Sequence, residues 1–162
     1  MKEYDVVVIG SGAGLSLAYR ALSANMRVAL VAKDYPGGTC INVGCVPSKT
    51  LIYAADMVRL IEQAPKFGIN VRIDSIDFPG IMGNMRNAVR TTADSIRQDL
   101  KGSEGLDYYE EEGQFIEDYT LAAGSEKIRG KNIFIATGAR PAIPPIKGLN
   151  ETGYLTNESV LA

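Results

Sequence analysis

Val6-Val7-Val8-Ile9-Gly10-Ser11-Gly12-Ala13-Gly14 is the stretch of this 162-residue chain that decides the fold, because four β-branched residues lead directly into a glycine turn. Such a continuous run is typical of a strand buried on both faces of a parallel sheet. Residues 14–24 are helix formers with apolar positions at helical spacing, and residues 27–32 return to strand. This order predicts a right-handed βαβ unit at the start of an α/β domain.

The glycine turn indicates a nucleotide site. Glycines allow positive φ and a close approach of the backbone to a pyrophosphate, and the following helix offers N–H groups and the positive end of its dipole. The alternative is an ordinary tight βα turn, but the flanking strands and helix favour a nucleotide. Two residues depart from the dinucleotide fingerprint: Leu15 replaces a small residue and Ala32 replaces the acid that holds the ribose. Gly14 and Asp34 are candidate substitutes, and we expect weak binding of the adenosine half.

Composition excludes several classes of function. The net charge of −2 gives no basic footprint for nucleic acid or a membrane surface. The apolar run near the N-terminus is too short for a signal-peptide core or a membrane span, so the expected compartment is the cytoplasm. Two cysteines and no histidine do not favour a zinc site within one chain. In the cytosol, a cysteine pair is more often catalytic or redox-sensing than structural.

Both cysteines lie in the stretch Gly37–Lys49, five residues apart. In a regular helix this spacing gives about 7.5 Å along the axis, whereas a disulfide tolerates Cα atoms up to about 7 Å apart. A Cys40–Cys45 bridge therefore needs distorted backbone, which Asn42 and Gly44 would permit. The helix that follows, to about Gln63, would direct its N-terminal dipole at Cys45 and favour the thiolate. Spacing alone does not decide between a redox-active pair and the two alternatives, which are a pair of buried, inert cysteines and a static disulfide.

The rest of the chain predicts a third helix over residues 81–100 and then shorter segments. Segments 106–112, 114–117, 119–123 and 126–129, separated by turn residues, suggest a small antiparallel β-meander. Residues 131–138 form another buried strand that ends at a glycine. Residues 139–150 contain three prolines and are expected to be irregular chain leaving the domain.

Three segments together resemble a known family. Gly37-Gly38-Thr39-Cys40-x4-Cys45-Val46-Pro47-Ser48-Lys49 resembles the active-site signature of the class I flavoprotein disulfide reductases, which include dihydrolipoamide dehydrogenase, glutathione reductase and mercuric reductase. The glycine turn and segment 135–141 resemble the family's two other FAD-domain motifs. The resemblance spans essentially the whole chain. It implies a Rossmann-like FAD-binding domain over residues 1–150, with a parallel sheet, flanking helices and the meander, and a linker toward a nicotinamide-binding domain from residue 151 to 162.

The resemblance also implies roles for individual residues. Cys45 would be the flavin-facing thiol and Cys40 the interchange thiol, forming a reversible disulfide, with Lys49 near the flavin N5. Cofactor contacts would come from Gly10, Ser11, Gly12, Ala13 and Gly14 at the pyrophosphate, from Gly38, Thr39 and Lys49 near the redox pair, and from Lys33, Gly113, Thr137 and Gly138. Residues 110–112 have no match and are expected to be a solvated strand face.

The implied function is electron transfer between NAD(P)H, FAD and the cysteine pair, in an enzyme most like dihydrolipoamide dehydrogenase. Alternatives are a glutathione- or mercuric-reductase-like enzyme and a non-catalytic flavin-binding fragment. A nicotinamide Rossmann domain with incidental cysteines is a third. The expected partners are a small-molecule dithiol or disulfide and a second subunit, since family members are homodimers. The family's catalytic histidine comes from the partner subunit, and with no histidine in this sequence the chain alone is expected to be inactive.

Overall fold

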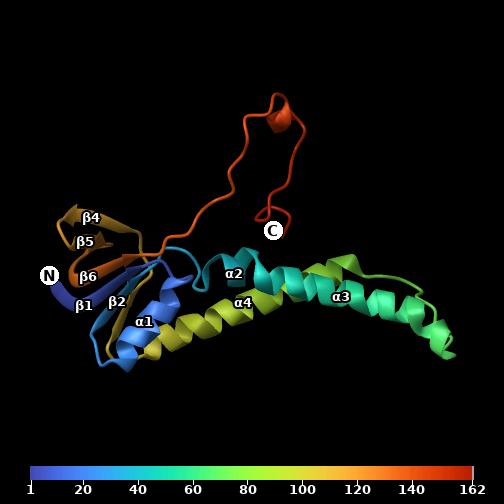
Figure 1. Cartoon of the computed structure of the whole chain (residues 1–162), viewed down its shortest axis with the longest axis horizontal. Coiled ribbons are helices and arrows are strands. Elements are labelled where there is room, and N and C mark those ends of the chain that lie inside the picture. Colours follow the sequence, from blue (N-terminus) through green and yellow to red (C-terminus); the bar gives the residue numbers. More distant parts are fainter. Residues whose placement is uncertain (162) are drawn as a thin grey trace.

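The computed structural model describes residues 1–161, which form one mixed six-stranded sheet with helices against it (Figure 1). The strands are β1 (Lys2–Ile9), β2 (Val28–Val31), β3 (Leu106–Tyr109), β4 (Gly113–Glu117), β5 (Thr120–Ala123) and β6 (Glu126–Ile135). The helices are α1 (Gly14–Ser23), α2 (Gly38–Val43), α3 (Cys45–Gln63) and α4 (Phe78–Gly102), with short 3-10 turns η1 (Ala64–Phe67) and η2 (Leu149–Glu151). The predicted α/β fold with a parallel sheet and flanking helices is confirmed.

The sheet order is β3-β2-β1-β6-β5-β4. Strands β3, β2, β1 and the second part of β6 are parallel, as the βαβ pattern predicted. Strand β1 lies near the centre, and from Val6 to Ile9 successive residues enter two cores in turn. One core, on the side of α1 and α4, contains Val6, Val8, Ala18, Val28, Leu30, Leu100 and Leu106. The other, beneath the meander, contains Tyr4, Val7, Ile9, Ala29, Val31, Leu121, Ala123 and Ile128.

The predicted meander exists, but its boundaries differ from the prediction. Segment 106–112 was assigned to it, whereas β3 pairs in parallel with β2 and extends the main sheet. Segments 126–129 and 131–138 were separated, whereas residues 126–135 form the single strand β6. Its first residues pair with β5 in antiparallel fashion, and residues 128–135 pair with β1 in parallel. Gly130 permits the continuity, since a Cβ there would lie 2.6 Å from the Cγ2 atom of Val7.

The second predicted helix is two helices, α2 and α3, separated at Gly44. The third, predicted from residue 81, begins earlier because Asp77 caps it: the Asp77 carboxylate accepts a hydrogen bond of 3.0 Å from the Gly80 N–H. Pro79 lies in the first turn, where its missing N–H costs nothing. Helices α3 and α4 form a long hairpin that extends away from the sheet (Figure 1).

Residues 136–161 are irregular apart from η2. This includes residues 139–150, as the prolines predicted, but also residues 136–138, which were assigned to the preceding strand. Figure 1 shows this segment leaving the sheet after β6. Its start is held by Arg140, whose guanidinium lies 3.3 Å from the Asp34 carboxylate and 3.2 Å from the Glu158 carboxylate. Across the described residues, no helix has both the length and the apolar character that crossing a membrane requires.

Candidate functional site

A cleft of about 860 Å³ opens at the carboxyl ends of β1 and β2, beside the chain that leaves β6. In open parallel sheets, ligands bind at this position, where the strand order reverses. The cleft brings together most of the predicted site residues. Those that line it are Gly10, Ser11, Gly12, Ala13, Lys33, Gly38, Thr39, Cys40, Gly113, Thr137 and Gly138. Gly14, Cys45 and Lys49 are the predicted residues that do not line it.

Gly10 shapes the turn at the end of β1. Its φ is +106°, and a Cβ atom there would lie 2.2 Å from the carbonyl oxygen of Ala136. The Gly10 N–H donates to the Val31 carbonyl at 2.8 Å, and the Ala136 N–H donates to the Ile9 carbonyl at 2.8 Å. The turn is therefore fixed between the ends of both neighbouring strands, and its bare backbone faces the cleft. A side chain at Gly10 would collide with the main chain of Ala136 and displace the turn.

Gly14 has a different position from the rest of the turn. It is buried as the first residue of α1, and a Cβ atom there would lie 2.7 Å from the Cγ1 atom of Val8. Gly14 thus provides the close helix–strand packing that Leu15, which is half-buried, does not. A direct contact between Gly14 and a cofactor stays a prediction.

The cleft wall beyond β2 carries paired charges. Ala32 is 9% exposed and supplies no ribose ligand. Lys33 Nζ lies 3.0 Å from Glu112 Oε1, and Asp34, the candidate substitute for the missing acid, is paired with Arg140. Gly113 opens β4, where a Cβ atom would lie 3.1 Å from the Cγ1 atom of Val31. This part of the cleft wall thus carries two ion pairs, Lys33–Glu112 and Asp34–Arg140, and has no acid at position 32.

In the acidic run 110–112, Glu111 and Glu112 are exposed, as the sequence predicted, but the run lies in the loop between β3 and β4 rather than on a strand. Glu111 and Glu112 line the cleft. The Glu110 carboxylate accepts hydrogen bonds from the guanidinium of Arg97 on α4 and lies 3.0 Å from Lys101 Nζ. The hydrogen bonds from Arg97 lower the pKa of Glu110 to about 2. Sequence reasoning missed these residues because their place depends on how the chain turns from β3 into β4.

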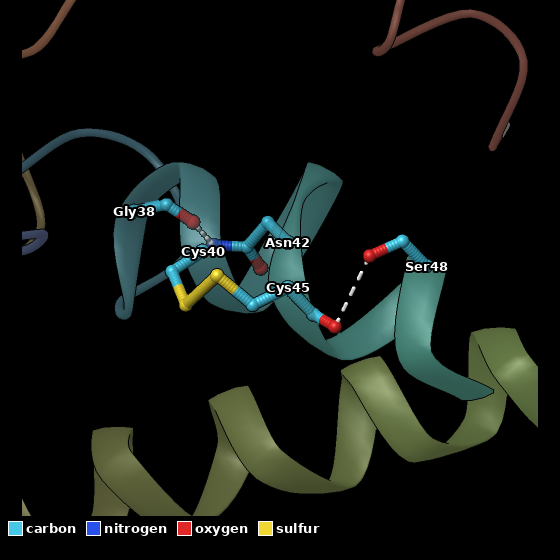
Figure 2. The surroundings of a disulfide bond; sticks show 5 residues. All are labelled: Gly38, Cys40, Asn42, Cys45 and Ser48. Carbon is cyan, nitrogen blue, oxygen red and sulfur yellow. Dashed lines mark hydrogen bonds between the residues drawn. A yellow bond between two sulfur atoms is a disulfide. The ribbon is translucent and has the colours of Figure 1, made fainter. Parts of the chain in front are cut away.

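Cys40 and Cys45 form a disulfide, with their Cα atoms 4.6 Å apart (Figure 2). Cys40 lies in α2 and Cys45 is the first residue of α3, so the predicted helix N-terminus at Cys45 is confirmed. Both residues are exposed, unlike a pair of buried, inert cysteines. The predicted backbone distortion lies at Gly44, where a Cβ atom would come within 2.7 Å of the Thr39 carbonyl oxygen. Asn42 is not part of this distortion, since it lies inside α2.

Lys49 lies on α3, one turn after Cys45, and is exposed to solvent. It shares α3 with Cys45 but does not border the cleft of the described residues. Its proposed place near a flavin stays a prediction.

Comparison with known proteins identifies the family. The model of the family described as "Pyridine nucleotide-disulphide oxidoreductase" matches residues 4–160. The chain belongs to this family of oxidoreductases. A mercuric reductase from Staphylococcus aureus is 37% identical over 160 residues, covering 98% of this chain and 29% of the relative. A dihydrolipoyl dehydrogenase from Acholeplasma laidlawii is 30% identical over 152 residues, covering 93% of this chain and 45% of the relative.

Solved structures of the family agree with the fold. The HOCl-induced flavoprotein disulfide reductase RclA from Escherichia coli superimposes with a TM-score of 0.79 at 30% identity, over 98% of this chain and 34% of RclA. A Cu(II) complex of the same protein matches with a TM-score of 0.77, also at 30% identity, over 96% of this chain and 33% of that one. The chain thus spans less than half the length of these family members. The predicted membership in the class I family is confirmed.

Proposed function

We propose that this chain is the FAD-binding portion of a flavin-dependent disulfide oxidoreductase in which Cys40–Cys45 alternates between disulfide and dithiol. One observation carries the proposal: a disulfide that bridges two helices has one of its cysteines, Cys40, in the wall of a glycine-lined cleft. Bound FAD supplies two-electron chemistry that a protein side chain does not provide. A static disulfide is less consistent with this position beside the cleft and with its exposure.

The residues present fit such a cofactor. The turn Gly10–Ala13 presents bare backbone to the cleft, and α1 begins directly after it, so its free N–H groups would hold the pyrophosphate. Gly38 and Thr39 would bind along the cofactor toward the disulfide, and Thr137 and Gly138 from the opposite wall. Lys33 and Gly113 would border the adenosine half. The paired state of Lys33 and Asp34 supports the expectation that this half is held weakly.

In the dithiol form, the two cysteines would have different roles, one facing the flavin and the other reacting with the substrate. Reduction breaks the S–S bond and adds two electrons, and the thiolate that results is favoured at Cys45, because this residue opens α3 and meets the positive end of its dipole. Cys40, on the other helix, would attack the substrate. The reductant would be NAD(P)H in the complete enzyme, which we expect to be homodimeric and cytoplasmic, with residues 1–150 as its FAD-binding domain and residues 151–162 as the linker onward.

For the substrate, we propose a soft metal ion bound by the two thiolates, ahead of the dihydrolipoamide that the sequence had suggested. Support comes from the mercuric reductases of Staphylococcus aureus and Bacillus cereus, 37% and 34% identical, the latter over 98% of this chain and 25% of the relative. Thiolates suit soft metals. A small disulfide is the second candidate, favoured by the dihydrolipoyl dehydrogenase of Acholeplasma laidlawii.

The cofactor is tested by reconstituting the chain with FAD and following flavin fluorescence, with NAD as the competitor. Binding of FAD in preference to NAD is expected, and tight NAD binding without flavin binding would contradict the proposal. The thiols are tested by alkylation after mild reduction and again after reoxidation, followed by peptide mapping. For the substrate, Hg(II) added to the reduced chain in equimolar amount should protect both cysteines from alkylation. Protection by oxidised lipoamide alone would favour the second candidate.

A further inference from the structure

We propose that Asn42 is a positioning residue for the redox pair, and that its side-chain amide strengthens the Cys40–Cys45 disulfide by fixing α2 to the loop before it. This inference rests on the proposed reversible cycle of the two cysteines. In this role Asn42 does not contact the substrate. It acts on the equilibrium between disulfide and dithiol by fixing the helix that carries Cys40.

The Asn42 side chain forms hydrogen bonds with three backbone carbonyls. Its Nδ2 atom lies 3.1 Å from the carbonyl oxygen of Tyr35, 3.3 Å from that of Pro36 and 3.0 Å from that of Gly38. An amide nitrogen has two hydrogens, so one of them is shared between two of these carbonyls. Figure 2 shows the Asn42 side-chain amide pointing back to the Gly38 carbonyl, in the same helix as Cys40. One side chain therefore binds the carbonyls of Tyr35 and Pro36 in the loop before α2, and that of Gly38, the first residue of α2.

Helix α2 contacts α3 and α4, but it is short. It has six residues and none of them is buried. Its N-cap, Gly37, has a left-handed backbone and gives no side-chain hydrogen bond. Isolated helices of this length are not stable in water. Two side-chain connections add to the hydrogen bond of 2.9 Å from the Gly37 N–H to the Ser11 carbonyl. The Asn42 amide joins α2 to the carbonyls of Tyr35 and Pro36 in the preceding loop, and the Cys40–Cys45 disulfide joins it to α3.

Two connections that order the same short segment reinforce each other. Once one of them has fixed α2, the other forms with a smaller loss of conformational entropy. The coupling is reciprocal, so the disulfide strengthens the Asn42 hydrogen bonds by the factor by which those bonds strengthen the disulfide. Loss of the amide must therefore favour the dithiol.

The test is the exchange equilibrium between the whole chain and dithiothreitol. In this reaction the protein S–S bond breaks, two thiols form, and dithiothreitol gives up two electrons and two protons as it closes to its cyclic disulfide. The oxidised and reduced fractions are counted by alkylation and mass spectrometry. For Asn42→Ala, the equilibrium should shift toward the dithiol by about fivefold or more, the lower end of measured couplings between linked sites.

Asn132→Ala is the matched control. The Asn132 amide also donates to a backbone carbonyl, that of Asp5 at 3.2 Å, but it lies on β6 away from both cysteines. This variant should keep the wild-type equilibrium. A wild-type equilibrium in Asn42→Ala, with a wild-type chain that cycles normally, would overturn the role of Asn42 alone. A wild-type disulfide that dithiothreitol does not reduce in the folded chain would overturn the proposed cycle and this inference with it.

A second measurement uses the unaltered chain and covers the case in which Asn42→Ala does not fold. By reciprocity, reducing the disulfide should speed hydrogen exchange at the Asn42 side-chain amide by the same factor of about five or more, while exchange at the Asn132 amide stays constant. An Asn42 amide that exchanges equally fast in the oxidised and reduced chains shows no coupling, and that result would refute the proposal.

Discussion

Gly12 and Gly38 meet backbone to backbone: a Cβ atom on Gly38 would lie 2.6 Å from the Cα atom of Gly12. Gly12 belongs to the turn after β1, and Gly38 opens the helix that carries Cys40. Next to this contact, the Gly37 N–H donates to the Ser11 carbonyl at 2.9 Å. The segment that would hold a pyrophosphate and the segment that holds the disulfide are therefore in direct contact.

Gly38→Ala should separate these two segments. The added methyl group meets main-chain atoms, and the φ of +59° at this residue disfavours a side chain. We expect a loss of about 1–3 kcal/mol in the free energy of unfolding and weaker flavin binding, measured by urea denaturation and fluorescence titration. Gly68→Ala is the control, because Gly68 has a φ of +76° and open space around it. Equal losses of flavin affinity in both variants would contradict this explanation.

Ala32→Glu should strengthen flavin binding. It restores an acid at the cleft position where dinucleotide-binding folds hold the ribose hydroxyls. A hydrogen bond to a charged group contributes about 1.5–3 kcal/mol. We therefore expect the dissociation constant for the flavin to fall about tenfold, as measured by fluorescence titration. Ala32→Gln adds similar bulk without the charge and should gain less. Weaker binding by Ala32→Glu would show that the pairs Lys33–Glu112 and Asp34–Arg140 exclude a further acid.

The ion pair of Glu110 with Arg97 should make stability depend on pH. The pKa of Glu110 falls from 4.5 to about 2 on folding, so the stabilisation is complete above pH 4.5 and is lost as the pH falls through 2. Because the pair is partly exposed, we expect a contribution of about 1 kcal/mol. Glu110→Gln should be less stable than the wild type at pH 7 and approach it toward pH 2. Parallel pH profiles of the urea midpoints would contradict this.

Tyr4→Phe should destabilise the end of the sheet opposite the cleft. The Tyr4 hydroxyl donates to the Asp107 carboxylate at 2.5 Å and lies 2.6 Å from the Tyr109 hydroxyl, so it joins β1 to β3. Tyr4 itself is 2% exposed. We expect a loss of about 1.5–3 kcal/mol, as for a hydrogen bond to a charged group, measured by thermal and urea unfolding. Tyr119→Phe, at a residue 58% exposed, should change little, and equal effects would argue against the network.

Single cysteine variants should separate the two thiols in flavin-loaded, reduced protein. Cys45→Ser should abolish long-wavelength absorbance from a thiolate in contact with the flavin, whereas Cys40→Ser should retain it. The reason is that the dipole of α3 favours the thiolate at Cys45. Visible absorbance spectra from pH 5 to 9 provide the measurement. The reverse pattern would exchange the roles assigned to the two cysteines.

The sequence predicted what depends on local patterns. Apolar, β-branched runs located β1 and the end of β6, and the glycines located the turn between β1 and α1. Covalent geometry alone required a break between Cys40 and Cys45, and the break lies at Gly44. The place of β3 depends on parallel pairing with a strand about 75 residues earlier in the chain, which no local pattern encodes. The position of Glu111 at the cleft was missed for the same reason. The start of α4 was placed too late because apolar spacing alone does not take account of the cap at Asp77 or of Pro79 in the first turn.

Strand β6 limits how the length of this chain can vary. Ile128 and Arg129 belong to both of its ladders, antiparallel to β5 and parallel to β1. Because side chains alternate along a strand, one inserted or deleted residue there would turn buried positions to solvent in both ladders. The turn at Gly124 and Ser125 lies outside both ladders and can absorb such a change. Evolutionary drift in length, and any engineered insertion, should therefore be tolerated at this turn and rejected a few residues later.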